Sequence, residues 1–233
     1  MVPDTVDDAI YIISHDLRAE MRALRELPRW IKDDIASAGH QLDADILDNI
    51  AMLINRADRL DRMMEDLLLY SRAGRAVSDR SAQVSHAFDR AKEQVGPANG
   101  FNIAARVEDA TVRIAEPDLV TFFEALIQNA IVHHDRGARS VQVSAQIMRE
   151  NLLIDVIDDG PGIHSKDYEK ALKVMTRLSQ NANNCGSGIG LPTCKKIAEQ
   201  YEGNLSLAAA PNGRGLHVKA ILKQRPPCGQ RTD

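Results

Sequence analysis

The sequence is poor in cysteine and aromatic residues and has no long apolar run. Its three cysteines, Cys185, Cys194 and Cys228, lack CxxC spacing, which argues against a disulfide framework and against a structural zinc site. Apolar runs such as LLLY and NLLI are far shorter than the roughly 20 residues that a membrane helix needs. We therefore expect a cytoplasmic chain with no membrane segment.

An excess of positive charge is also lacking. Lysine and arginine total 29 against 33 acidic residues, the formal net charge is −4, and no block of five basic residues occurs. A protein that binds nucleic acid through its phosphates needs a basic patch, so nucleic acid is not an expected partner. The 233 residues, 44% of them hydrophobic, suit one medium domain or two small ones, and we favour two.

The first part of the chain has the period of long helices. Between Val6 and Ile35 apolar residues recur at steps of three or four, and Pro28 inside this run predicts a kink. From Ile50 to Leu67 they alternate in steps of three and four, as in a heptad seam. Two such helices carry more apolar surface than they can bury between them. A homodimeric four-helix bundle is therefore predicted, with a monomeric bundle closed by the rest of the chain as the alternative.

The second part has mixed periods. A polar segment from Ser71 to Gln83 is typical of a linker, which we place at 75–83 between a domain at 1–74 and another at 84–224. Beyond it the patterns predict strands at 101–107, 140–148, 151–158, 204–210 and 215–222, and helices at about 86–95, 117–134 and 188–202. This order predicts an α+β sandwich of one mixed sheet and several helices. The tail at 225–233 is predicted to be disordered.

One glycine-bearing site reads VIDDGPGI, from Val156 to Ile163. A strand ends in Asp158, and Gly160 and Gly162 then turn the backbone tightly enough for a flat ring to lie against it. A carboxylate at a strand end can accept a hydrogen bond from an exocyclic amine such as that of adenine. A plain hairpin turn explains this stretch equally well, because Asp-Gly and Pro-Gly are ordinary turn dipeptides.

A second site reads GSGIGLPTCKKIAE and precedes a helical pattern. Gly186, Gly188 and Gly190 would leave the first amides of that helix free to point at a phosphate. The site comes too late for a dinucleotide-binding fold, and the GK[ST] of a Walker sequence is missing. The alternative is a flexible glycine-rich loop, and the helix that follows favours phosphate binding.

A third site, FFEALIQNAIVHH, puts Asn129 in a small, apolar helical neighbourhood. An amide oxygen can coordinate Mg²⁺, which usually takes one or two protein ligands and completes its shell with phosphates and water. A hydrogen-bonded core amide is the alternative, and on the evidence of Asn129 alone it is the better one.

The N-terminal helix also carries SHDLRAEMR, from Ser14 to Arg22. His15 lies two residues from both Ile13 and Leu17, about 200° around the helix, so it should point away from the apolar stripe. A neutral imidazole offers a nitrogen lone pair, and Asp16 could hold the other ring proton. A solvated His-Asp pair on a helix surface is the alternative.

These motifs, in this order, resemble those of the two-component sensor histidine kinases. SHDLRAEMR is similar to their phosphoacceptor box, LIQNA to the N box, and VIDDGPGI and GSGIGLPTCKKI to the two glycine boxes. The VMTRLS stretch is similar to the FQRLH segment of the phytochrome-like branch. The resemblance implies a helical hairpin that forms a dimeric four-helix bundle, followed by an ATP-binding sandwich of the histidine kinase, gyrase and chaperone type.

The resemblance also implies a reaction. His15 would take the γ-phosphoryl group of ATP, with Mg²⁺ as cofactor, and pass it to an aspartate of a response regulator. Asp16 would assist, and Arg177 is the candidate cation on a mobile lid from about Ser165 to Cys185. The implied nucleotide-binding residues are Asn129, which is also the metal ligand, Asp158, Gly160, Gly162, Ile163, Gly186, Gly188, Ile189, Gly190 and Leu191.

Several positions depart from the family's usual residues. Glu20 stands in place of a proline, Ala125 of a second asparagine, Val132 of a basic residue, and Val174 and Met175 of aromatic residues. His133 or His134 could substitute for the basic residue. Kinases that also dephosphorylate their regulator commonly have Thr or Asn one turn after the phosphoacceptor, where this chain has Ala19.

Two other functions stay open. One is a non-catalytic histidine phosphotransferase with a decayed nucleotide site, against which the retained Asp158 and glycines argue. The other is a pure interaction module, for which His15 would be incidental.

Overall fold

A computed structural model describes residues 6–75, 81–96, 100–135, 139–176 and 186–224, without the side chains of residues 6–9, 14 and 15. The chain divides into two compact units, Met1–Arg72 and Ala73–Asp233. They are called the helical unit and the sheet unit below, and each is described by itself.

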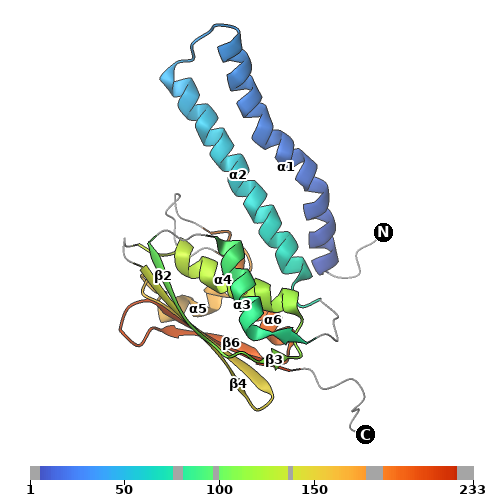
Figure 1. The fold of residues 1–233 in the computed structure, drawn as a ribbon. Helices are drawn as coiled ribbons and strands as arrows, with labels where there is room; N and C mark the ends of the chain where they lie inside the picture. The colour runs from blue at the N-terminus through green and yellow to red at the C-terminus, as the bar shows by residue number, and fades with distance from the viewer. Residues whose placement is uncertain (1–5, 76–80, 97–99, 136–138, 177–185, 225–233) are drawn as a thin grey trace. The chain divides into compact units, whose positions relative to one another are not determined.

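The helical unit consists of two long helices, α1 (Val6–Ser37) and α2 (Ala44–Arg72), that pack along each other (Figure 1). Helix α1 runs through Pro28 without a break. It stops at Gly39, whose φ of 77° suits glycine. The Gly39 amide donates to the Ala36 carbonyl at 3.1 Å and the His40 amide to the Ile35 carbonyl at 3.2 Å, which closes the last turn.

Each helix buries part of its apolar stripe and leaves the rest open. Along the seam of α2, Ile50 and Ala57 are buried, whereas Leu53 and Leu60 are 58% and 46% exposed. On α1, Met21 is buried while the apolar residues one turn away on either side stay exposed. Half of the predicted apolar stripe is therefore not covered within one chain.

The sheet unit is built on a five-stranded sheet with the order β2-β4-β5-β7-β6. Strands β2 and β4 are parallel and all other neighbours are antiparallel, which confirms the predicted sandwich with a mixed sheet. In chain order the elements are β1 (Ala82–Gln83), α3 (Val84–Val95), β2 (Phe101–Val107), β3 (Thr111–Val112), α4 (Glu116–Val132), β4 (Arg139–Met148), β5 (Asn151–Asp158), η1 (Ser165–Asp167), α5 (Tyr168–Ala171), α6 (Gly190–Gln200), β6 (Asn204–Ala209) and β7 (Leu216–Lys223).

The core of the sheet unit lies between one face of this sheet and helices α3, α4 and α6, which cover that face (Figure 1). Every second residue of a strand points to the same face, so the strands bury alternate positions. In β5 these are Leu152, Ile154 and Val156. Phe88 of α3 meets Phe123 of α4 edge to face, with ring centroids 5.5 Å apart.

The structure departs from the sequence-based prediction in short elements and at helix ends. Strands β1 and β3 pair with each other, and β1 falls at the end of the predicted linker. The expected mobile loop from Ser165 begins instead with the short helices η1 and α5. Helix α4 stops at Val132, so His133 and His134 follow it, and α6 starts at Gly190 rather than at 188.

The region 177–185 and the tail 225–233, predicted as lid and disordered tail, lie outside the described residues. Among the residues that are described, no helix has both the length and the apolar character needed to cross a membrane.

Candidate active site

Three segments of the sheet unit come together: the C-terminal half of α4, the loop 158–163 after β5, and the segment 186–190 before α6. A Cβ atom at Gly160 would lie 3.8 Å from the carbonyl oxygen of His133. A Cβ atom at Gly186 would lie 3.6 Å from His133 Nε2 and 3.6 Å from Val132 Cγ1. Both glycine-bearing motifs of the sequence thus lie against the end of the helix that carries Asn129.

Asp158 lies at the end of β5 with its two carboxylate oxygens used differently. Oδ1 accepts hydrogen bonds from the Gly160 amide at 2.9 Å and from the Leu216 amide at 3.1 Å. Oδ2 accepts no bond from any described residue. Burial raises the pKa of Asp158, and the two amide donors oppose that shift. The side chain is therefore fixed through one oxygen while the other is free to accept a hydrogen bond from a ligand.

The loop after Asp158 packs directly on the β6–β7 turn. Gly162 has a φ of 72°, and a Cβ atom there would lie 2.8 Å from the carbonyl oxygen of Gly215. Gly215 has a φ of 104°, and its Cβ atom would lie 1.8 Å from the carbonyl oxygen of Asp158. Neither position has room for a side chain. The backbone of the loop after Asp158 and that of the β6–β7 turn are therefore in direct contact.

The stretch PNGRG, at 211–215, joins the predicted strands 204–210 and 215–222, and the sequence analysis did not assign it to the site. The two glycines on either side of Arg214 were the available signal, because one of them supports Asp158. Arg214 adds a further contact: its Nε donates to the Asp159 carbonyl at 3.2 Å, and its guanidinium pairs with Asp135.

His134 is buried and engaged in a structural pair. Its Nε2 lies 2.7 Å from Asp159 Oδ1, and the same oxygen accepts the Ser140 amide at 2.9 Å. Phe101 packs against the imidazole edge to face, at 5.6 Å between centroids. Desolvation alone would raise the pKa of Asp159, but the Ser140 amide and His134 hold it below its usual value. His134 therefore does not face the glycine segment as a substitute for the basic residue missing at Val132.

His133 is the histidine that faces the segment 186–190. Its side chain keeps an exposed edge, yet desolvation by the surrounding protein lowers its pKa, and the nearby charge of Asp158 opposes the shift. A neutral imidazole at this place can donate one hydrogen bond and accept another but carries no fixed positive charge.

Asn129 lies on α4, one turn before the helix ends, and is partly exposed. Its side-chain amide makes no hydrogen bond with a described residue, unlike a core amide, which would be hydrogen-bonded. Among the residues described, no group of three or more His, Cys, Asp or Glu side chains could hold a metal by itself. A Mg²⁺ ion at Asn129 would thus need phosphate oxygens and water to complete its shell.

The segment Gly186–Gly190 is held between α4 and the turn at 173–176. Gly188 has a φ of 76°, a Cβ atom there would lie 2.6 Å from the Thr176 carbonyl, and its own carbonyl accepts the Met175 amide at 3.1 Å. Gly190 lies beside Ala125: a Cβ atom at Gly190 would lie 3.7 Å from the carbonyl oxygen of Ala125.

Helix α6 starts directly at this segment, with Ile189 and Leu191 buried. Because Pro192 has no amide hydrogen, Gly190 and Leu191 supply the free amides at this end of the helix. Two of the departures noted in the sequence, Ala125 and Val132, are the α4 residues that line the glycine segment.

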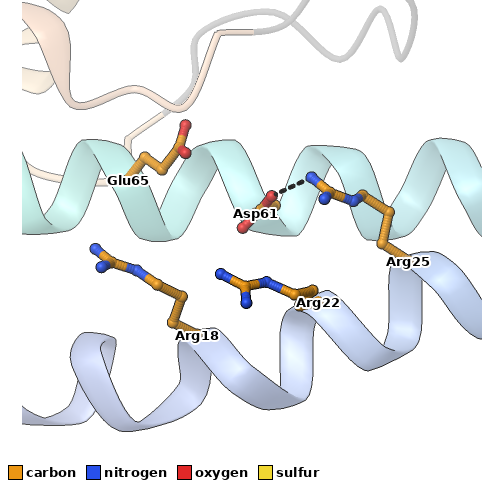
Figure 2. Close-up of a pocket in the computed structure, with 5 residues that line it drawn as sticks. All are labelled: Arg18, Arg22, Arg25, Asp61 and Glu65. Atoms are coloured by element: carbon orange, nitrogen blue, oxygen red, sulfur yellow. Dashed lines mark hydrogen bonds and ion pairs between the residues drawn. The ribbon is translucent and has the colours of Figure 1, made fainter.

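The helical unit carries His15 within α1, but its side chain lies outside the described part of the chain. Asp16 is exposed on the same helix. One turn further, Figure 2 shows a groove between the two helices, with Arg18, Arg22 and Arg25 on α1 facing Asp61 and Glu65 on α2. Arg25 Nη1 donates to Asp61 Oδ2 at 2.9 Å, while Arg18 and Arg22 form no ion pair with a described residue. Arg177, the predicted lid cation, lies in the undescribed region.

Comparison with known proteins finds a family match within the sheet unit and more distant relatives over most of the chain. Residues 114–226 match the family of histidine kinase-, DNA gyrase B- and HSP90-like ATPases. Cyanobacterial phytochrome A from Nostoc sp. is 26% identical over 198 residues, which are 84% of this chain and 26% of the phytochrome. Sensor protein KdpD from Mycobacterium tuberculosis is 29% identical over 218 residues, which are 88% of this chain and 24% of KdpD. The chain thus spans about a quarter of the length of these curated relatives.

Solved structures agree in fold. Full-length ShkA in complex with AMPPNP superposes with a TM-score of 0.66 at 18% identity, covering 96% of this chain and 48% of that one. The mycobacterial sensor histidine kinase MprB gives a TM-score of 0.56 at 21% identity, covering 64% of this chain and 99% of that one.

Proposed function

We propose that the chain is an ATP-dependent protein histidine kinase, with a catalytic domain of the histidine kinase-, DNA gyrase B- and HSP90-like ATPase family. In this proposal it phosphorylates its own His15 and passes the phosphoryl group to an aspartate of a response regulator. The observation that carries the proposal is the meeting of Asp158, with its free carboxylate oxygen, and both glycine segments at the end of α4.

The nucleotide would lie in that place with its base at Asp158 and its phosphates at α6. Asp158 Oδ2 would accept the adenine amine, and Gly160, Gly162 and Ile163 would offer the backbone against which the ring lies. Gly186, Gly188, Ile189, Gly190 and Leu191 would hold the phosphates, because the first amides of α6 and its dipole favour negative charge.

Asn129 would be the protein's ligand for Mg²⁺. Its accessible, unengaged amide fits that task, and the phosphates of ATP would supply most of the remaining oxygens. When bound, Mg²⁺ neutralises charge on the phosphoryl group that is transferred. Arg177 would add a second positive charge from the lid.

His15 would act as the nucleophile. A ring nitrogen forms a bond to the γ-phosphorus of ATP while the bond to the β,γ-bridging oxygen breaks, and ADP leaves. Asp16 would hold the proton of the other ring nitrogen and so orient the free lone pair. In the second transfer, a carboxylate oxygen of the regulator's aspartate takes the phosphoryl group and the nitrogen–phosphorus bond breaks.

The helical unit would carry out both steps as a homodimer. The domain predicted at 1–74, whose last two residues the structure places in the sheet unit, would be the dimerisation and phosphoacceptor domain, and residues 84–224 the catalytic domain. The open line of α2, represented by Leu53 and Leu60, supports this assignment, because a second copy packed against it would complete a four-helix bundle.

Incubation of the full chain with γ-labelled ATP and Mg²⁺ tests the function. We expect acid-labile, base-stable label in the wild type and none in His15→Gln. His40→Gln, at an exposed histidine of the helical unit, should keep the label. Label that persists in His15→Gln would refute the assignment of His15. Nucleotide binding without label would leave a phosphotransferase, and the absence of both would leave an interaction module.

A further inference from the structure

Asp118 is a buried carboxylate in the first turn of α4, with only 3% of its surface exposed. Its Oδ1 accepts the Gly74 amide at 2.9 Å, and its Oδ2 accepts the Tyr201 hydroxyl at 2.9 Å. The Tyr201 oxygen in turn accepts the Ala115 amide at 2.9 Å. These bonds form one connected buried network, and a buried network of this kind is costly to open because each lost partner leaves a polar group unpaired.

The residue that Asp118 holds belongs to the segment directly after α2. Helix α2 ends at Arg72, and Ala73 is already 4% exposed and part of the sheet unit's core. Gly74 is buried with a φ of 76°, and a Cβ atom there would lie 3.0 Å from Gln200 Cβ. Packing, backbone conformation and a hydrogen bond thus fix these two residues in the sheet unit.

The network also touches the far ends of the two helices that reach the nucleotide site. Asp118 lies in the first turn of α4, and Asn129 follows about 16 Å further along the same helix. Tyr201 directly follows α6, which begins at Gly190 beside the other glycine residues. A displacement of residues 73–74 would therefore act on two stiff helices that both lead to the site.

We infer that Asp118 and Tyr201 are positioning residues that pin the chain leaving α2 to the sheet unit, so that the hinge between the units is the Arg72–Ala73 junction. Gly74 and β1 then both lie in the sheet unit, so the hinge comes before the linker that the composition predicts at 75–83. We call this attachment of residues 73–74 to Asp118 and Tyr201 the pin. Its location does not depend on the proposed function, whereas its effect on phosphorylation rests on that function.

Amide hydrogen exchange of the full chain tests the pin without any activity. In Asp118→Ala we expect exchange of the peptide that contains Ala73 and Gly74 to rise about tenfold, with β5 peptides unchanged. Asp118→Asn keeps an oxygen for the Gly74 amide and should stay within about threefold of the wild type. Ser71→Ala removes another buried hydroxyl, bonded to the Leu68 carbonyl, and should change nothing at 73–74.

Unchanged exchange at 73–74 in Asp118→Ala would overturn the pin. If Asp118→Ala does not fold, Tyr201→Phe replaces it, because it removes one donor to the same carboxylate and should still raise exchange at 73–74 above that of Ser71→Ala.

A pair of insertions tests where the hinge lies. Four residues, Gly-Ser-Gly-Ser, are inserted between Arg72 and Ala73 in one variant and between Val77 and Ser78 in the other. We expect the first to change the rate of His15 labelling about tenfold with ATP affinity unchanged, and the second to change both less than about twofold. Equal effects of the two insertions would overturn the hinge assignment. Absence of label in the wild type would instead count against the proposed function, and the exchange experiment would still decide the pin.

Discussion

The two units of the chain differ in how much of their apolar surface they cover by themselves. Among the described residues, thirteen large apolar side chains are exposed in the helical unit and three in the sheet unit. The sheet unit closes its core between one sheet and three helices, whereas the helical unit fully buries little more than Met21, Ile50, Ala57 and Leu68. The sheet unit therefore covers its own core within one chain, while the helical unit leaves a large apolar surface open.

The largest expected effect breaks the pairing of the helical unit. Leu53→Asp combined with Leu60→Asp places two charges on the open line of α2, where a second copy would have to bury them. We expect dimer affinity to fall at least about a hundredfold, or about 3 kcal/mol, with the wild type a dimer at micromolar concentration.

Light scattering measures this effect. Ile221→Asp, at an exposed apolar residue of the sheet unit, is the matched control and should leave the dimer mass unchanged. A monomeric wild type, or a dimeric double variant, would contradict the prediction.

The next largest effect is expected from a substitution that disrupts one of the closest backbone contacts of the sheet unit. Gly215→Ala would bring a Cβ atom to 1.8 Å from the Asp158 carbonyl, so the β6–β7 turn must move. We expect a loss of about 2–4 kcal/mol in the free energy of unfolding and weaker ATP binding, because Asp158 moves as well. Gly213→Ala, also at positive φ but with open space around it, should cost only about 1 kcal/mol. Urea denaturation would distinguish the two, and equal losses would argue against the contact.

The sheet unit also shows which features a sequence reveals. Strands β2 and β5 have the predicted bounds because their alternation is long enough to define a period. Strands β1 and β3 are two residues each, and no period can be read from two residues.

The residues of the candidate site that were missed depend on contacts distant in sequence. The sequence marks Asp158 as a strand end, but only the folded chain brings the Gly215 backbone and the Leu216 amide to it. The burial of His134 beside Asp159 and the bond between Gly74 and Asp118 are likewise invisible to local patterns.

A smaller effect sharpens the assignment of the nucleotide to the sheet unit. Asp158→Asn should weaken ATP binding about tenfold, because the NH2 group left at the Oδ2 position cannot accept a hydrogen bond from the adenine amine. Its backbone bonds to Oδ1 can be kept by the amide oxygen, so the fold should persist. Calorimetric titration measures the affinity, and an unchanged dissociation constant would reject the pocket.

The difference in ATP affinity between the wild type and Asp158→Asn should depend on pH, and the direction follows from the pKa shift of Asp158. Burial raises the pKa of Asp158 in the free protein, and the adenine amine prefers the ionised carboxylate. The advantage of the wild type over Asp158→Asn should therefore be complete at neutral pH and shrink as the pH falls through the raised pKa, above the range of an ordinary aspartate at about 3.9. Titration by ATP itself affects both proteins equally and cancels in the ratio. A ratio that grows on acidification would contradict the shift.

In the helical unit, a charge reversal is expected to change the rate of phosphotransfer by a factor no larger than the change in ATP affinity in Asp158→Asn. Arg22 lies in the groove beside Asp61, two turns after His15, and pairs with no charged side chain that the structure describes (Figure 2). We expect Arg22→Glu to slow phosphotransfer to the regulator about fivefold, and less at high salt, while labelling of His15 stays unchanged. Arg56→Glu, an exposed arginine of α2 outside the groove, is the control. Equal slowing by both variants would show a general charge effect and no role for the groove.

The smallest expected effect concerns dephosphorylation of the regulator, which we expect the chain to accelerate hardly at all. Ala19 lies four residues after His15 on α1, and residues at this spacing lie on the same helix face. A methyl group cannot orient the water that would attack a phosphorylated aspartate, so the chain should act mainly as a phosphoryl donor. Mixing purified phosphorylated regulator with the unphosphorylated chain and ADP should leave the decay rate within about twofold of the regulator's own. A decay well above that rate, retained in His15→Gln, would mean that another side chain positions the water and that the assignment from Ala19 is wrong.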